Sequence, residues 1–453
     1  MSFQIQPTKV IHHLHDRTQS LMHIDLLITN TTILPFPDTE QVIAKGFVAI
    51  TGTLISTVGP MSACPPTADA TVISGAGQLV MPGLVNGHCH APMTLFRGLA
   101  DDLDLHTWLQ THIFPAEARQ VNPEMVYWCS KLAAAEMLLS GTTTVADGYF
   151  LEDEVARACV ETGIRCVAAQ AVLDFPAPGV PDPAQNIKVA ARFLEHWQGR
   201  DPLITPGIFA HSAYTCSNTT LQQAKELTRY HQAPLFIHVA ETRDEGRHIA
   251  EPQASTPIGH LQALHLLDPD TICVHCTWAT DSDLVDLTAH GCAVVTCPQS
   301  NAKLASGRMP LSAMLQQRVR LALGTDSAAS NNSLDIFREM DFAAKVHKVT
   351  PCDPAAAPAG TLLHMATAGG AEALGLQNGH GTLAPGAPAD LILLDLQQPH
   401  TQPFHGPRLL VYSQAGSSVR TVIVNGRIVV YDRQLRTIDL DATCDRVRTL
   451  AAG

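Results

Sequence analysis

The stretch Leu79-Val80-Met81-Pro82-Gly83-Leu84-Val85-Asn86-Gly87-His88-Cys89-His90 decides the fold. It is a short apolar run that ends in two histidines separated by a single cysteine. Side chains alternate along a β-strand, so both imidazoles would point to one side while Cys89 points to the other. Two neutral imidazoles at a strand end can bind a divalent metal ion. The run therefore predicts a buried strand over residues 80–86, followed directly by a pair of metal ligands.

The composition indicates a globular enzyme without an anionic partner. The 453 residues suffice for one large barrel and a smaller domain. Hydrophobic residues make up 45% and charged ones 16%, which favours an extensive core over disorder. The net charge of −13 argues against nucleic acid or an anionic membrane as partner. No apolar run approaches the roughly 20 residues of a membrane span, and no secretory signal is visible. The 12 cysteines lack a disulfide spacing, so we expect a cytoplasmic protein.

The middle of the chain, residues 83–383, alternates apolar runs with amphipathic stretches. Eight such repeats are typical of a (β/α)₈ TIM-type barrel, an α/β fold with catalytic side chains at the carboxyl ends of its strands. We expect the barrel strands at residues 80–86, 142–147, 165–173, 203–210, 235–240, 271–275, 293–297 and 319–326.

The two ends of the chain resemble each other. Residues 23–82 and 384–453 both contain short alternating runs punctuated by glycines, and Asn425-Gly426 between apolar runs predicts a hairpin. We expect both ends to form one small β-sandwich domain. Residues 1–22 are predicted to be an irregular extension, and we expect its histidines to form no metal site: His12, His13 and His15.

Residue types that bind metals or carry protons recur at the same end of five predicted strands. A histidine inside an apolar run, such as His238, costs desolvation energy unless something pairs with it. Each of these histidines alone could be a satisfied core residue, but chance placement of all of them is hard to accept. The set comprises His88, His90, His211, His238, Glu241, His275 and Asp326.

Metal-assisted hydrolysis is the chemistry that this set suits. Three imidazoles and a carboxylate would hold one divalent cation and lower the pKa of a bound water to about 7, giving a metal-bound hydroxide. Glu241 would shuttle the proton, and His275 would orient the nucleophile or polarise the attacked centre. Asp326 would both bind the metal and accept a proton. The expected metal ligands are His88, His90, His238 and Asp326.

The chain resembles the 5′-methylthioadenosine/S-adenosylhomocysteine deaminases of the amidohydrolase superfamily. The resemblance begins with residues 81–90, covers nearly the whole chain after residue 22, and is specific because its motifs occur together. The further motifs lie at residues 91–103, 113–117, 140–144, 210–214, 297–301 and 324–333.

This resemblance implies hydrolytic replacement of the adenine 6-amino group, with ammonia and an inosine-type product released. It implies one Zn²⁺ on the four ligands above, although Fe²⁺ or Mn²⁺ would accept the same groups. Glu117 would hydrogen-bond the ribose hydroxyls, and His211 would contact the nucleoside alongside Glu241 and Asp326. We expect Trp108 to pack in the core rather than to wall the pocket. The resemblance also suggests a homo-oligomer.

Departures from the family bear on the substrate. Gln170 stands where members that accept S-adenosylhomocysteine carry an arginine, and residues 174–182 contain no basic residue. An amino-acid carboxylate would meet no bidentate partner there, so we expect 5′-methylthioadenosine or adenosine to be preferred. Ser327 replaces a usual glycine and Gln299 a position that is often acidic, and either could reshape the pocket.

Other functions stay open at this point. A deaminase or dehalogenase of the same superfamily that acts on a free purine or an s-triazine ring is the main alternative. A two-metal amidohydrolase would need a bridging lysine, and residues 203–212 contain none. A non-catalytic scaffold would not need Glu241 beside intact ligands. Cys273-x-His275-Cys276 lacks the second half of a zinc knuckle.

Overall fold

The structure is a computed structural model that describes residues 23–66, 69–349, 351–413 and 415–452. The predicted extension of residues 1–22, with its three histidines, lies outside the described residues. Within the described ranges, no helix has both the length and the apolar character needed to cross a bilayer.

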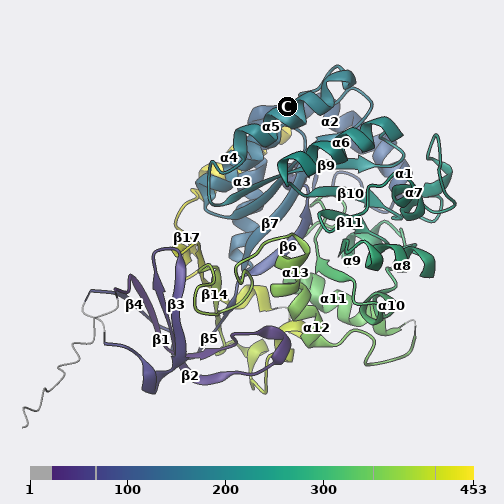
Figure 1. The fold of residues 1–453 in the computed structure, drawn as a ribbon. Helices are drawn as coiled ribbons and strands as arrows, with labels where there is room; N and C mark the ends of the chain where they lie inside the picture. The colour runs from purple at the N-terminus through teal and green to yellow at the C-terminus, as the bar shows by residue number, and fades with distance from the viewer. Residues whose placement is uncertain (1–22, 67–68, 350, 414, 453) are drawn as a thin grey trace, which may run out of the picture.

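The larger part of the molecule is a parallel eight-stranded barrel (Figure 1), which confirms the predicted fold class. Each strand pairs with the next one along the chain, as strand–helix repeats require. The strands are β6 (Leu84–Cys89), β7 (Thr142–Tyr149), β8 (Arg165–Val172), β9 (Ile204–Ser212), β10 (Leu235–Val239), β11 (Thr271–His275), β12 (Ala293–Thr296) and β13 (Arg320–Leu323).

The barrel closes between its first and last strands through side-chain and backbone hydrogen bonds. Asn86 Nδ2 donates to Thr325 Oγ1 over 2.7 Å, and the Thr325 amide donates back to Asn86 Oδ1 over 3.0 Å. The Asp326 amide donates to the His88 carbonyl over 3.0 Å. A Cβ on Gly324 would lie 2.9 Å from the His88 backbone nitrogen, so this approach requires glycine. Closure therefore brings the residue after the last strand against the end of the first.

The prediction of one strand over residues 80–86 was wrong, because two strands share that apolar run. β5 (Gln78–Pro82) pairs with strands of the small sheet, whereas β6 begins the barrel at Leu84. The break falls at Gly83, where a Cβ would overlap the Thr143 side chain. Hydrophobic periodicity cannot detect this break, since both strands are buried and equally apolar.

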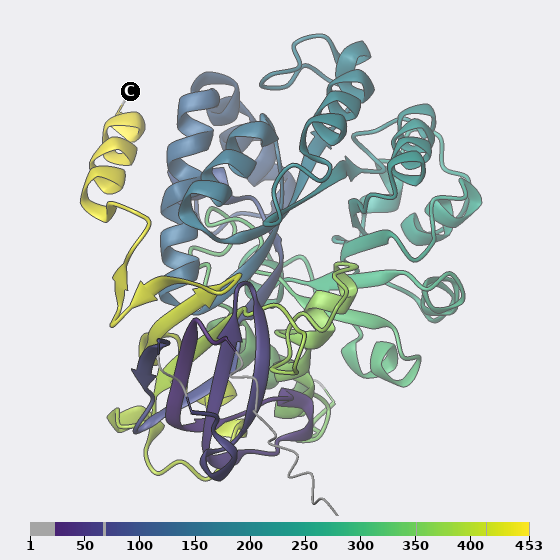
Figure 2. The ribbon, with the colours of Figure 1, turned by 60° about the vertical axis from the view of Figure 1, so that its left-hand side comes forward.

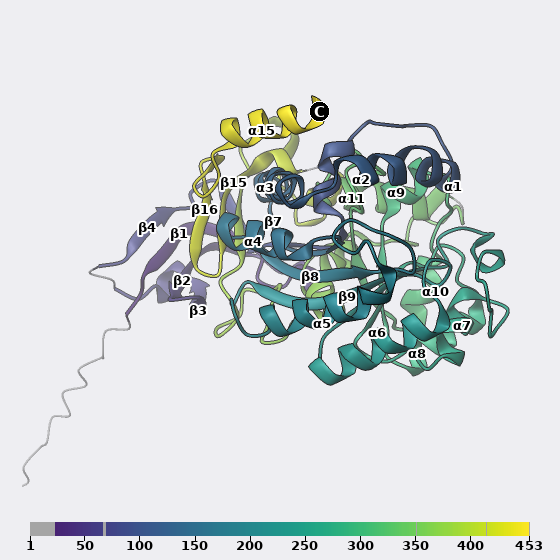
Figure 3. The same cartoon turned by 90° about the horizontal axis from the view of Figure 1, so that it is seen from above.

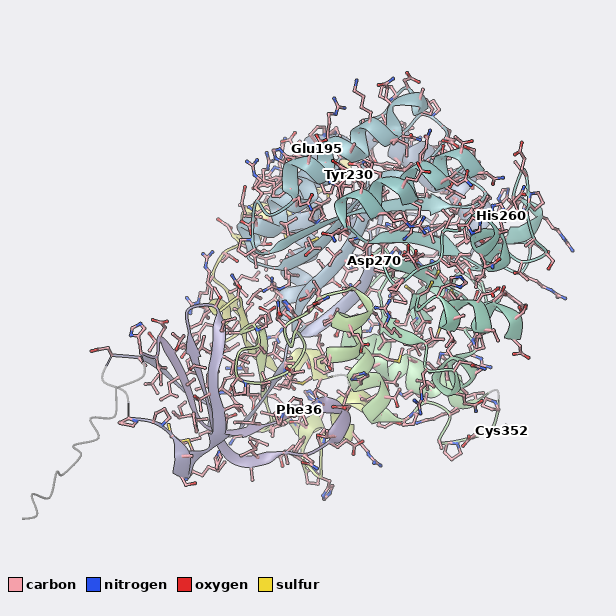
Figure 4. The ribbon with its side chains drawn as sticks, viewed as in Figure 1. Phe36, Glu195, Tyr230, His260, Asp270 and Cys352 are labelled. Atoms are coloured by element: carbon pink, nitrogen blue, oxygen red, sulfur yellow. The ribbon has the colours of Figure 1, made fainter. Side chains whose placement is uncertain are left out.

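Helices cover the outside of the barrel, and Figure 4 places Tyr230 of α6 on this outer side, where it is 84% exposed. The helices are α1 (Leu105–Trp108), α2 (Phe114–Gln120), α3 (Pro123–Leu139), α4 (Glu152–Thr162), α5 (Asn186–Trp197), α6 (Asn218–His231), α7 (Pro257–Ala263), α8 (Asp281–Ala289), α9 (Pro298–Lys303), α10 (Leu311–Gln316), α11 (Ile336–Val349), α12 (Ala359–Met365), α13 (Ala368–Ala373), α14 (Arg408–Tyr412) and α15 (Leu440–Ala452).

The smaller part is built from both ends of the chain, as predicted, and its strands form one mixed sheet (Figure 2). Its buried apolar side chains from both ends form one core, and the hairpin at Asn425-Gly426 joins β15 to β16 as expected. Its strands are β1 (Leu26–Ile33), β2 (Ile43–Thr51), β3 (Leu54–Pro60), β4 (Thr71–Ser74), β5, β14 (Leu391–Asp395), β15 (Val419–Val424), β16 (Arg427–Tyr431) and β17 (Gln434–Leu435).

Polar contacts join the two parts. Arg165 at the start of β8 forms a buried ion pair with Asp390, with Nε 2.8 Å from Oδ2. At the end of the chain, α15 lies along α3 (Figure 3), and Arg446 Nε donates to Glu124 Oε1 over 3.0 Å. The small sheet thus supports the amino-terminal end of the barrel and leaves the opposite end to the site.

Candidate active site

The four predicted metal ligands meet at the carboxyl end of the barrel. β6 positions His88 and β10 positions His238. His90 directly follows β6, and Asp326 is the third residue after β13. Asp326 Oδ1 lies 3.5 Å from His88 Nε2 and 3.4 Å from His90 Nε2, and the Nε2 atoms of His88 and His238 are 3.2 Å apart. All four side chains are buried. The ligand atoms of His88, His90 and Asp326 lie within 4.8 Å of one another, and so do those of His88, His238 and His275, so His88 joins two overlapping triads.

The protonation states of these imidazoles favour a cation between them. His90 Nδ1 lies 2.6 Å from the Gly148 carbonyl and so carries the proton, which leaves Nε2 as a free lone pair. Burial lowers the pKa of His90 to about 4 and that of His238 well below its usual value, so both are neutral. The Nε2 atoms of His88 and His238 face each other, and those of His88 and His90 face the Asp326 carboxylate. The set matches the donors that one Zn²⁺-type ion takes.

The carboxylate of Asp326 is held by hydroxyl groups. Oδ2 accepts from Ser300 Oγ over 2.6 Å and from Ser330 Oγ over 2.9 Å, and Oδ1 accepts from the Ser327 amide over 2.8 Å. Burial by itself would raise the pKa of Asp326, but hydrogen bonding to His88 and the surrounding imidazoles hold this pKa well below its usual range. Asp326 therefore stays ionised, with Oδ1 toward the histidines.

Glu241 and His275 lie together beside the ligands. His275 Nε2 is 3.7 Å from Glu241 Oε2, and Asn301 Nδ2 donates to His275 Nδ1 over 3.0 Å, so the His275 proton sits on Nε2. Burial raises the pKa of the Glu241 carboxyl well above its usual range, and the charges of Asp326 and Glu245 raise it further. The pair offers a carboxyl group that can hold a proton and an imidazole N–H that points at it.

Backbone strain accompanies these positions. Ala240, His275, Cys276 and Asp326 all have positive φ, at +51°, +76°, +48° and +59°. Residues with side chains seldom adopt this conformation, and such strain clusters at functional sites. Buried Glu245 holds one of these turns, because its carboxylate accepts from the amides of Ala240 over 3.0 Å and Glu241 over 2.7 Å. The strand ends are thus bent to turn their side chains into the site.

A mostly apolar pocket extends from this cluster, with about 670 Å³ of space including its mouth. Trp108 is buried in the hydrophobic core, as expected, but it also lines the pocket, which was not expected. His211 also lines the pocket, 5.1 Å from His238 between ring centroids, and burial lowers its pKa to about 3. Glu117 on α2 lines the same pocket.

The residues that depart from the family pattern lie as follows. Gln170 is buried and accepts from the Glu152 amide over 3.3 Å, and Asp174 accepts from the Ser217 amide over 2.6 Å at the start of α6. Ser327 lines the pocket, whereas Gln299 donates to Glu339 on α11 over 2.7 Å. Among the described residues that line the pocket, none is a lysine or arginine.

Several residues of the site were not found from the sequence. Ser300 and Asn301 lie in a motif quoted above, but no spacing shows that they contact Asp326 and His275. Tyr149, whose hydroxyl donates to Glu117 over 2.6 Å, ends the apolar strand β7 like any core aromatic residue. Only its position at a strand end, which it shares with the ligands, was a signal.

Two groups of side chains lie at the carboxyl end of the parallel barrel: a buried His₃Asp cluster (His88, His90, His238 and Asp326) and a carboxyl–imidazole pair (Glu241 and His275). This combination defines a metal-dependent hydrolase. The chain belongs to the amidohydrolase family, whose sequence model matches residues 79–429. It is 43% identical to 5-methylthioadenosine/S-adenosylhomocysteine deaminase 1 of Syntrophus aciditrophicus, over 95% of this chain and 97% of that protein.

Two further proteins are similar to the chain over nearly its whole length. The chain is 42% identical to the 5′-deoxyadenosine deaminase of Methanosarcina mazei, over 92% of this chain and 95% of that protein. The solved structure of an adenosine deaminase from Xanthomonas campestris with bound zinc superposes with a TM-score of 0.91 at 35% identity, covering 95% and 98% of the two chains. The resemblance drawn from the motifs is thereby confirmed.

Proposed function

We propose that the chain is a hydrolytic deaminase of adenine nucleosides that prefers 5′-methylthioadenosine or adenosine to S-adenosylhomocysteine. The observation that carries the proposal is the layout of one pocket. The His₃Asp cluster and Glu241 lie at one end, and the buried carboxyl group of Glu117 lines the same space. The relatives, which are named as deaminases of such nucleosides, support this assignment.

One Zn²⁺ would be held by His88, His90, His238 and Asp326, although Fe²⁺ or Mn²⁺ suits the same donors. When bound, the ion would lower the pKa of a water molecule to about 7 and supply a nucleophile at neutral pH. Imidazole binds a metal in its neutral form, so with the ionised carboxylate the four donors would carry a charge of −1, which a divalent cation would reverse.

Glu241 would act as the proton carrier. Its raised pKa allows its carboxyl group to hold a proton at neutral pH and to donate it to ring nitrogen N1 as oxygen adds to C6. Glu241, ionised by this transfer, would receive the proton that Asp326 takes from the added oxygen and give it to the departing amine, and ionisation of the next water molecule would restore the proton on Glu241. The C6–O bond forms, the C6–N bond breaks, and ammonia leaves.

His275 and Asp326 would act on the oxygen that adds to C6. The Nε2–H of His275, fixed by Asn301 on the other side of the ring, would hydrogen-bond this oxygen and stabilise its negative charge. Asp326, ionised and facing the ligands, would accept its proton. Both groups are buried, so water competes little for these hydrogen bonds.

Recognition of the nucleoside would involve Glu117 and His211. A carboxylate can accept two hydrogen bonds from the vicinal ribose hydroxyls, and His211 lines the pocket beside His238. The apolar wall, which includes Trp108 and Leu173, suits an uncharged 5′ group. A homocysteine carboxylate would meet no lysine or arginine among the described lining residues.

Ammonia release from a panel of substrates tests the proposal. We expect turnover of 5′-methylthioadenosine, adenosine and 5′-deoxyadenosine, and a KM about tenfold higher for S-adenosylhomocysteine, because its carboxylate is desolvated without a partner. Fast turnover of free guanine or of a triazine, with none of any nucleoside, would replace the proposal by the alternative function. Size-exclusion chromatography and cell fractionation would test the predicted homo-oligomer and cytoplasmic location.

A further inference from the structure

A buried tyrosine and a buried glutamate form a pair in the pocket wall. Tyr149 ends β7, and its hydroxyl donates to Glu117 Oε1 over 2.6 Å. The two side chains are 3% and 6% exposed as residues and both line the pocket. Among the described residues, no other hydrogen bond to the Glu117 side chain occurs, so Oε2 is left for a ligand in the pocket.

The strand that carries Tyr149 also holds a metal ligand. The carbonyl of Gly148, the residue before Tyr149, accepts from His90 Nδ1, and the Tyr149 ring lies 6.3 Å from the His90 ring between centroids. Phe150 packs against Tyr149 at 5.0 Å between centroids. The tyrosine hydroxyl is therefore fixed relative to the reacting end of the pocket. Glu117 lies on the short helix α2, and the hydrogen bond ties this helix to that frame.

We propose that Tyr149 is a positioning residue that sets the distance between the sugar-binding carboxylate of Glu117 and His90, a proposed metal ligand. By fixing this distance, Tyr149 favours nucleosides over free bases as substrates. This inference rests on the proposed function, since it assumes that Glu117 binds the ribose diol. The tyrosine hydroxyl occupies one carboxylate oxygen and turns the other toward the pocket. Without it, the carboxylate can rotate or take up a proton, and it then no longer offers two acceptors to the diol.

The test is Tyr149→Phe, which removes the hydroxyl and keeps the ring. We expect kcat/KM for adenosine to fall about tenfold, mainly through KM, because one hydrogen bond to a charged group is lost. For 2′,3′-dideoxyadenosine, which lacks the diol, we expect a change of less than about twofold. A tyrosine with only a structural role would lower turnover of both substrates together.

A double-mutant cycle and a matched control sharpen the result. In a Glu117→Gln background, Tyr149→Phe should cause no further loss with adenosine, because the two residues act on the same contact. Tyr127→Phe is the control: its hydroxyl also donates to a glutamate, Glu161 Oε2 at 2.5 Å, but between α3 and α4 outside the pocket. Tyr127→Phe should leave kcat/KM unchanged for both adenosine and 2′,3′-dideoxyadenosine.

The outcomes separate the inference from the function beneath it. The positioning role is wrong if Glu117→Gln lowers kcat/KM for adenosine selectively while Tyr149→Phe leaves this value unchanged. It is also wrong if the losses in kcat/KM from the two substitutions add in the double mutant. In both cases the proposed deaminase activity still stands. If the wild-type chain releases no ammonia from any adenine nucleoside, the proposed function itself fails.

Discussion

The two ends of the pocket are built differently. At the reacting end, side chains on strand ends are each held by a second contact: His90 by the Gly148 carbonyl, His275 by Asn301, and Asp326 by hydroxyl groups. At the end proposed to bind the sugar, Glu117 projects from a short helix, and its side chain has a single hydrogen bond among the described residues, from Tyr149. This contrast indicates that chemistry depends on the rigid barrel and substrate choice on the helices above it. Changes at the first end should therefore affect every substrate, and changes at the second only those with a ribose.

Removal of a metal ligand should have the largest effect. We expect His238→Ala to lower ammonia release about 10⁴-fold or more from every substrate, since residues that act as a unit fail together. Metal content, measured by atomic emission on the same sample, should fall as well. His196→Ala on α5, which removes an exposed imidazole, is the matched control and should change neither quantity. Full metal content with full activity in His238→Ala would show that the cluster is not the metal site.

Glu241→Gln should have the second largest effect on activity. We expect kcat to fall about 10³-fold on nucleosides with and without the ribose diol, because proton transfer is lost while the shape is kept. Metal content should stay that of the wild type, since Glu241 is not a proposed ligand. A loss of kcat confined to substrates with the ribose diol would indicate that Glu241 binds the sugar and does not transfer the proton.

Glu117→Gln should have a smaller and selective effect. We expect kcat/KM for adenosine to fall about 10- to 100-fold, since hydrogen bonds from the diol to a charged group are weakened. The value for 2′,3′-dideoxyadenosine should hardly change. Equal losses on both substrates would contradict the division of the pocket into two ends.

The pH dependence should be the smallest effect. Burial raises the pKa of Glu117 to about 7, against the opposing hydrogen bond from Tyr149. The carboxyl is ionised above this pH and protonated below it, so the preference for adenosine over its dideoxy analogue should weaken as pH falls from 8 to 6. We expect a change of a few fold, up to about tenfold, in the ratio of the two kcat/KM values. In Glu117→Gln the ratio should be flat, and a wild-type ratio independent of pH would contradict the sugar-binding role.

The same contrast explains what could be predicted from the sequence. Six residues were predicted because each lies near the end of an apolar run or follows one, and a parallel barrel brings these ends to one face: His88, His90, His238, Glu241, His275 and Asp326. The contact between Tyr149 and Glu117 was not found, because it joins a strand to a helix 32 residues away and no periodicity encodes it. The break between β5 and β6 at Gly83 was not predicted for a related reason, because two buried strands of different sheets form one continuous apolar run in the sequence.

Metal content and ammonia release, measured together on one preparation, test the central claim most directly. The metal would be removed with a chelator and returned as zinc in steps, with adenosine as substrate. We expect activity to disappear with the metal and to return in proportion to it, saturating near one ion per chain, with inosine as product. Full activity in the metal-free chain, or no ammonia from any adenine nucleoside in the fully loaded chain, would contradict the proposal that the His₃Asp cluster carries out this hydrolysis.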